Sequence, residues 1–101
     1  TGIKGDIIAP YSMTATEWTL VADQSGSIVI DVWKDVYASF PPTVADTVTG
    51  SEKPTLSAAT KNQDTSLATP ITITAGDILR FNVDSASTVT RAVLMYKGTR
   101  T

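Results

Sequence analysis

TEWTLVADQSGSIVIDVWK, residues 16–34, is the stretch that decides the fold class. On either side of its centre, apolar and polar side chains alternate with a period of two, the pattern of a strand with one buried face. The predicted inward residues are Trp18, Leu20 and Ala22 in the first run and Ile28, Ile30 and Val32 in the second. Between the runs, Asp23 and Gly26 supply turn chemistry, because Asp bonds its own backbone and Gly tolerates a positive φ. The stretch therefore predicts a β-hairpin.

Further strands are predicted on both sides of this hairpin. Residues 4–9 form an opening strand that ends at Pro10, because proline lacks the N–H group that a sheet ladder needs. The remaining strands are expected at 71–74, 77–84 and 88–98, with a turn at 85–87. The first two of these are expected to pair with each other, with Leu79, Phe81 and Val83 on the inward face.

The composition favours an all-β fold. Threonine makes up about one residue in six, and its β-branched side chain, like those of the many Val and Ile residues, fits a pleated surface. About seven or eight short strands separated by turn signals are typical of an antiparallel sandwich or jelly roll. We therefore expect a single β-sandwich domain over residues 1–101, of the jelly-roll type.

Residues 35–70 are predicted to form one long irregular loop. Four prolines interrupt them and the period-two alternation is lost: Pro41, Pro42, Pro54 and Pro70. Within the loop, PPTVADTV (41–48) suits one helical turn after the prolines, and TLSAAT (55–60) suits a short strand. A loop of this length inside a small domain is usually functional or contains short elements of its own.

Charge and composition exclude several classes of function. The net charge is −2, and the Lys and Arg residues are scattered, so nucleic-acid binding is disfavoured. No apolar run approaches the roughly 20 residues of a membrane span, so membrane insertion is not expected. The absence of Cys and His removes Ser-His-Asp and Cys-His machinery and nearly all zinc or iron sites. The chain begins at Thr1 rather than Met, which indicates trimming or a piece of a longer polypeptide.

The aromatic residues at the end of the second predicted strand are the candidate site. Trp33 lies on the outward face of its strand, and Tyr37 and Phe40 follow it at the start of the loop. One interpretation is an aromatic platform for a sugar ring or a partner protein, because flat rings offer contact area at low entropic cost. The other is a small core of the loop itself, packed on the sheet and held by Pro41 and Pro42.

The acidic residues raise two further hypotheses. Asp46, Glu52 and Asp64 lie in the irregular segment and carry oxygen ligands suited to calcium, but they lack the Asp-x-Asp spacing of a calcium loop. A glycosidase requires two carboxylates about 5 to 10 Å apart. Asp31 is the best candidate for one of them, although an outward Asp on a strand usually serves solubility. We therefore predict no metal site, no cofactor and no enzymatic activity.

A series of short motifs in residues 21–67 and 74–100 resembles a small domain that recurs in tailed-bacteriophage virion proteins. The motifs occur in this order: Ala-Asp-Gln-x-Gly-Ser-Ile, Asp-Val-Trp-Lys-Asp, Pro-Pro-Thr-Val-Ala-Asp, Lys-Pro-Thr-Leu-Ser and Phe-Asn-Val-Asp-Ser-Ala. Such domains lie towards the ends of tail-fibre and other structural polypeptides. The resemblance covers about three quarters of the chain, a much longer match than a single short motif.

The resemblance implies a β-sandwich accessory domain on the virion surface, in a tail fibre, a spike or the capsid. Its implied partners are other virion proteins, further copies of itself in a trimer, and host-surface glycans. No ligand site is implied for individual residues, but symmetric assembly adds a third possible role for Trp33, Tyr37 and Phe40, burial against another protomer. A second hypothesis is a carbohydrate-binding module attached to a polysaccharide-active protein.

Overall fold

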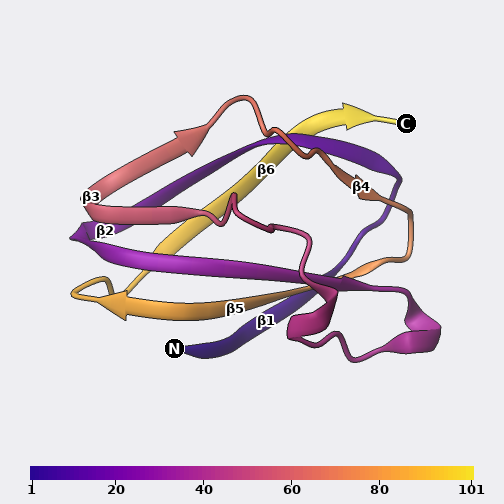
Figure 1. Ribbon diagram of the computed structural model, residues 1–101, viewed down its shortest axis with the longest axis horizontal. Helices are drawn as coiled ribbons and strands as arrows, with labels where there is room; N and C mark the ends of the chain where they lie inside the picture. The colour runs from indigo at the N-terminus through magenta and orange to yellow at the C-terminus, as the bar shows by residue number, and fades with distance from the viewer.

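Six antiparallel strands make up nearly all the regular structure of the computed structural model, which describes residues 1–101 (Figure 1). The strands are β1 (Gly2–Ile8), β2 (Met13–Asp35), β3 (Thr55–Asp64), β4 (Ile71–Ile73), β5 (Ile78–Ser87) and β6 (Ala92–Arg100). Two 3-10 turns, η1 (Tyr37–Ser39) and η2 (Val44–Asp46), follow β2, and there is no α-helix. The predicted all-β class is confirmed.

β2 is the centre of the sheet. The strand order is β1-β5-β2-β3, and both β4 and β6 pair with β2 as well. One strand can pair with four others because β2 is 23 residues long and reverses direction near its middle, where Figure 1 shows it turning back at one end of the molecule. The structure therefore has six strands instead of the predicted seven or eight, since two expected strands belong to one continuous strand.

The predicted hairpin at residues 16–34 is wrong in its pairing, although the chain does reverse near residues 23–26. The first arm of β2 pairs with β4, with β6 and with residues 61–64 of β3, whereas the second arm pairs with β5 and with the beginning of β3. The arms do not pair with each other. Their inward side chains instead meet in one core.

That core contains seven of the nine residues predicted from the alternation to face inward, and the other two are half-buried against it. The cluster consists of Ala9, Ala15, Trp18, Leu20, Ile28, Ile30, Val32, Leu56, Leu67, Ile71, Ile73, Leu79 and Val83, with Ala22 and Phe81 half-buried against it. A two-residue period ties each side chain to one face of its strand, so the buried face follows directly from the sequence.

Three other local predictions are refined or corrected by the structure. The short strand predicted at 55–60 within the long loop is confirmed as β3 and extends to Asp64, so the long irregular part of the predicted loop is residues 36–54. The short strand β4 pairs with β2 and not with β5. The predicted turn at 85–87 lies inside β5, where Ser87 pairs with Ser27 of β2, because that strand continues as far as the corner of β2.

Asp23 fastens the corner of β2 to the segment between β5 and β6. Its carboxylate accepts hydrogen bonds from the backbone N–H groups of Thr90 and Arg91 and from the Thr90 hydroxyl, and its own N–H donates to the Arg91 carbonyl. Gly26 leaves room for this approach, because a Cβ there would lie 2.6 Å from the Ser87 carbonyl oxygen. The corner therefore needs both residues that the sequence marked as turn chemistry.

We expect the Asp23 carboxyl to titrate unusually low. Hydrogen bonds lower the pKa of Asp23 from 3.8 to about 2, and the bond from the Thr90 hydroxyl has a larger effect than the bond from the Arg91 N–H. A two-dimensional NMR titration of the side-chain carboxyl carbons measures this value. Thr90→Val should move the pKa of Asp23 back towards 3.8, and an unchanged pKa in that variant would contradict the assignment.

Candidate functional site: an exposed aromatic loop

The segment after β2 presents apolar side chains to solvent. We call residues 36–46 the aromatic loop; it contains η1 and η2 and projects at one end of the molecule (Figure 1). Tyr37 is 84% exposed and Phe40 is 41% exposed, and Val36 and Val44 are also exposed. Four of the eleven exposed large hydrophobic side chains of the protein gather in this short loop, which makes it a candidate contact surface.

The three predicted aromatic residues do not form one cluster. Trp33 is 9% exposed, its indole N–H is buried without a hydrogen-bond partner, and its backbone forms a β-bridge with Thr47. Phe40 lies under the Arg80 guanidinium, which is 5.2 Å from the ring centroid. Arg80 also binds the Asp6 carboxylate through two hydrogen bonds of 2.8 and 2.9 Å. Only Tyr37 has a free ring face of the kind that a ligand platform requires.

Local hydrogen bonds order the aromatic loop. Thr43 and Asp46 form a capping box around η2, in which the Asp46 carboxylate accepts the Thr43 N–H at 2.8 Å. The Ser39 N–H donates to the Val36 carbonyl, and the Val36 N–H donates to the Asp35 carboxylate, both at 3.0 Å. Pro42 is fully buried. These contacts tie the loop to its own turns and to the end of β2, although its aromatic side chains are exposed.

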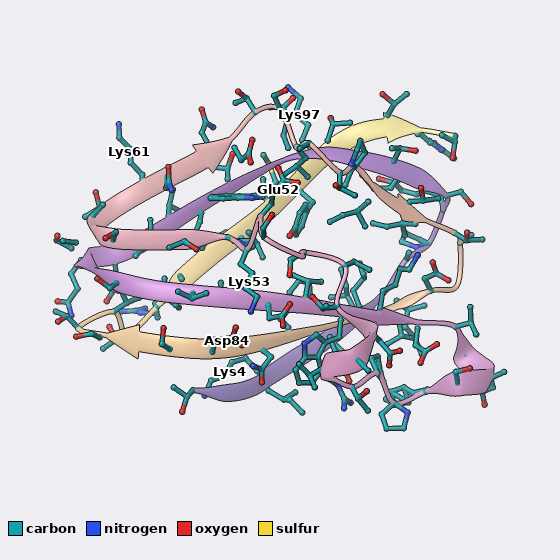
Figure 2. All side chains as sticks on the ribbon, in the orientation of Figure 1. Lys4, Glu52, Lys53, Lys61, Asp84 and Lys97 are labelled. Atoms are coloured by element: carbon teal, nitrogen blue, oxygen red, sulfur yellow. The ribbon has the colours of Figure 1, made fainter.

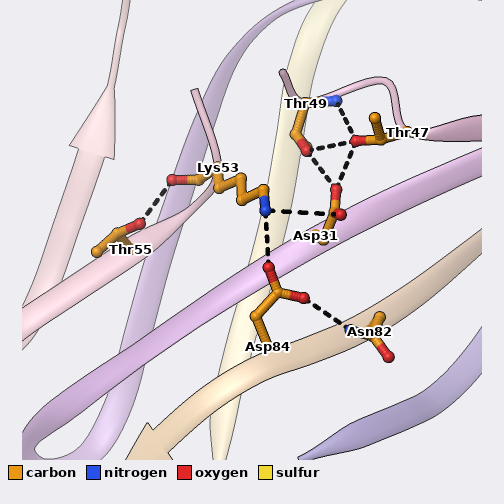
Figure 3. Close-up of polar contacts among 7 residues, drawn as sticks. All are labelled: Asp31, Thr47, Thr49, Lys53, Thr55, Asn82 and Asp84. Atoms are coloured by element: carbon orange, nitrogen blue, oxygen red, sulfur yellow. Dashed lines mark hydrogen bonds and ion pairs between the residues drawn. The ribbon is translucent and has the colours of Figure 1, made fainter. Parts of the chain in front are cut away.

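A buried carboxylate anchors the segment that follows the loop (Figure 3). Asp31, 2% exposed, accepts hydrogen bonds from the hydroxyls of Thr47 and Thr49, both at 2.6 Å. Lys53 lies 3.7 Å from the other Asp31 oxygen and 2.8 Å from Asp84, toward which it points across β2 (Figures 2 and 3). We call these five residues the Asp31 network. The prediction that Asp31 is a solvated outward residue is wrong, because this segment covers the outward face of β2.

The Asp31 network favours charged forms of its members. Burial raises the pKa of Asp31, but the hydrogen bonds from Thr47 and Thr49 outweigh it, so the pKa lies below its usual value of 3.8. The hydrogen bond to Asp84 raises the pKa of Lys53 above its usual value. Asp31 is consequently an ionised structural anchor near neutral pH, with one oxygen held by the two hydroxyls and the other facing Lys53.

Two polar hollows meet at the base of the aromatic loop. The first, of about 430 Å³, is lined by Tyr37, Asp35, Lys34 and the backbone turn 74–77. The second, of about 350 Å³, is lined by hydroxyl-bearing residues of two segments and by Lys34: Thr47, Thr49, Ser51, Thr69 and Thr72. We call them the tyrosine hollow and the hydroxyl hollow.

Lys34 belongs to both hollows and separates them. Its ammonium donates to the Thr72 carbonyl at 2.6 Å and lies 3.6 Å from the buried Asp77 carboxylate. Asp77 in turn accepts the Thr74 N–H at 2.8 Å, which fixes the turn that forms the wall of the tyrosine hollow. These contacts hold the Lys34 side chain in place along the boundary.

The three candidate calcium ligands lie apart, and each serves the backbone. Asp46 caps η2, Glu52 accepts the N–H groups of Ala68 and Thr69, and Asp64 accepts the N–H of Ser66. No group of three or more acidic residues is arranged so that it could hold a metal ion. The cations are also dispersed, with Lys4, Lys61 and Lys97 at separate edges of the molecule (Figure 2).

No protein-family model, no curated protein and no solved structure matches this chain. None of its helical segments is long and apolar enough to cross a membrane. The protein is an all-β protein with an anchored aromatic loop beside two polar hollows, and these features are the evidence for its function.

Proposed function

We propose that the protein is a non-enzymatic structural module of a phage virion surface protein, such as a tail-fibre, spike or capsid-surface domain. It serves particle architecture or contact with a host-surface receptor, and the aromatic loop is its contact surface. The observation that carries this proposal is the 84% exposed Tyr37 ring on a loop anchored by the Asp31 network. A rigid loop loses little entropy when it binds. The motif resemblance described above supports the virion setting.

We further propose that the bent sheet is a jelly-roll-like β-sandwich. The two arms of β2 pair with different strands and yet share one core, as the two layers of a sandwich would. This arrangement places the aromatic loop at one end of the sandwich, where binding loops of such folds commonly lie.

Free strand edges support the architectural role. β1 pairs only with β5, all seven of its residues are exposed, and these include Ile3, Ile7 and Ile8. An uncovered apolar edge strand is a ready site for pairing with another chain. In the virion, neighbouring proteins or further copies in a trimer would cover it.

A carbohydrate-binding module is the alternative function. The polar lining of the tyrosine and hydroxyl hollows, next to an exposed aromatic ring, favours this alternative over a second protein-contact surface. It differs from the first proposal in requiring glycan binding by the isolated domain without self-association.

Tyr37→Ala tests the aromatic loop as an assembly surface. We expect light scattering coupled to size exclusion to show a trimer whose dissociation concentration rises about tenfold in Tyr37→Ala, because the lost ring contact corresponds to about 1.4 kcal/mol. The unfolding midpoint should not change, because the side chain is exposed.

The matched control is Tyr11→Ala, since Tyr11 is also exposed but lies outside the aromatic loop and outside both hollows. A trimer that Tyr37→Ala leaves unaffected would place the assembly surface elsewhere, with the β1 edge tested next. A monomer at every concentration would contradict the trimer and leave receptor contact as the role of the loop.

A further inference from the structure

We propose that the tyrosine hollow and the hydroxyl hollow are two adjoining subsites, on either side of Lys34, that together bind a neutral oligosaccharide of at least two sugar units. This inference deepens the receptor-contact form of the proposed function and rests on it. It concerns a defined site, with Lys34 between two subsites, and a defined charge class of ligand.

The size and position of the hollows fit two neighbouring subsites. Their volumes of about 430 and 350 Å³ each fall within the range of small-molecule sites. Lys34 lines both hollows. Two linked groups of one ligand, one in each hollow, would therefore be separated by this single residue. A chain of linked rings suits this arrangement better than one compact molecule.

The lining selects a ligand rich in hydroxyl groups. Small-molecule sites are usually lined by apolar side chains, whereas five of the eleven residues that line the hydroxyl hollow are Thr or Ser. The hydroxyls of Thr47 and Thr49 are engaged with Asp31 and with each other, whereas those of Ser51, Thr69 and Thr72 make no hydrogen bond within the protein and are free to bind a ligand. An apolar ligand would cover these three free hydroxyls without giving them hydrogen-bond partners.

The tyrosine hollow supplies the complementary groups. The Lys34 ammonium has three protons, of which Thr72 and Asp77 engage two, so one remains for a ligand oxygen. One oxygen of Asp35 accepts the Val36 N–H, and the other has no partner. The exposed Tyr37 ring offers an apolar face to the C–H face of a sugar. A donor, an acceptor and a flat ring together match adjacent sugar hydroxyls and the ring that carries them.

The charges around the hollows favour a neutral sugar. Lys34 is the only cation in the lining, and three carboxylates share that lining with it: Asp35, Asp77 and Glu52. The net negative charge repels uronic and sialic acids. The site therefore discriminates against acidic glycans.

The test is an NMR titration of the isotope-labelled protein with neutral mono- to tetrasaccharides of glucose, galactose, mannose and N-acetylglucosamine. We expect saturable shifts of the amide signals of Lys34, Tyr37 and Thr72, and affinity that increases from mono- to disaccharide. A matched series carrying a uronic acid should bind at least about tenfold more weakly, a difference of about 1.4 kcal/mol from repulsion near the surface.

Two variants separate the stacking and the charge contributions of the tyrosine hollow without disturbing the core. Tyr37→Ala should weaken binding about tenfold through loss of stacking, whereas Tyr11→Ala should leave it unchanged. Asp35→Asn keeps the acceptor for the Val36 N–H but removes a charge, so the discrimination against acidic sugars should shrink. Unfolding curves of each variant show whether the fold is retained.

Failure of this inference differs from failure of the proposed function. If no neutral oligosaccharide perturbs Lys34 or Tyr37, or if acidic sugars bind more tightly, the inference is overturned. The proposed function then depends on the oligomer measurement with Tyr37→Ala. A trimer sensitive to that substitution but without glycan binding would retain the function and remove the sugar site.

Discussion

Gly98→Ala is expected to destabilise the protein by about 3 kcal/mol, because the added methyl group would clash with backbone atoms, which cannot move aside as a flexible side chain can. Gly98 of β6 pairs with Ala15 of β2, and a Cβ at this position would overlap the Thr14 carbonyl oxygen and lie 2.7 Å from the Ala15 Cα. Only separation of β6 from β2 makes room for the methyl group. Urea unfolding followed by tryptophan fluorescence measures the loss as a shift in midpoint at constant slope.

The matched control for this prediction is Gly5→Ala. Gly5 also lies in a strand, β1, but a Cβ there would meet nothing within 4 Å. We expect a change within about 0.5 kcal/mol, as for most exposed substitutions. Surface substitutions change the free energy of unfolding by up to about 0.5 kcal/mol. If the free energy of unfolding of Gly98→Ala lies within about 1 kcal/mol of the wild-type value, the close approach of β6 to β2 is wrong.

The buried faces of the strands could be predicted from the sequence, but their partners could not. Trp18, Leu20, Ile28 and Ile30 are buried as their alternation indicates, since the period of two is a local property. Which strand lies beside β2 depends on contacts between distant segments. The turn residues around Gly26 suit a tight hairpin and a corner equally well, and the approach of β5 and β6 to that corner decides between them.

The candidate site could likewise be predicted only in part, because its geometry depends on contacts between distant segments. Tyr37 was predicted because an aromatic residue in a loop is conspicuous, but the exposure of its ring and the burial of Trp33 depend on how the loop returns to the sheet. The two hollows are built from segments around Lys34, Thr49 and Thr72, which share no motif. One signal for the Asp31 network was present in the sequence. Thr47 and Thr49 are two residues apart, so an extended segment directs both hydroxyls to the same side, and Asp31 is an acidic residue within an apolar run.

Asp31→Ala is expected to reduce the free energy of unfolding by about 3 kcal/mol, because hydrogen bonds to a buried charge are strong and their loss leaves partners unsatisfied. The substitution removes the acceptor of the Thr47 and Thr49 hydroxyls and the second partner of Lys53. Asp31→Asn keeps the shape and should cost about 1 to 2 kcal/mol. Within the same network, Asp84→Asn removes a more exposed partner of Lys53, and there a loss under about 1 kcal/mol is expected.

The pH dependence of stability separates the charge of Asp31 from its shape. Since the pKa of Asp31 is lowered in the folded protein, the unfolded chain takes up its proton first as the pH falls, and acid favours unfolding. The contribution is present in full above about pH 5 and is lost as the pH falls through the folded pKa, below 3.8. Asp6 and Asp23, whose pKa values are also lowered, titrate in the same window in wild type and variant alike. Urea unfolding from pH 7 to pH 2.5 should therefore show that the difference in free energy of unfolding between wild type and Asp31→Asn narrows in acid, because protonated Asp31 resembles the amide. A difference of constant size would mean that Asp31 acts through packing and not through its charge.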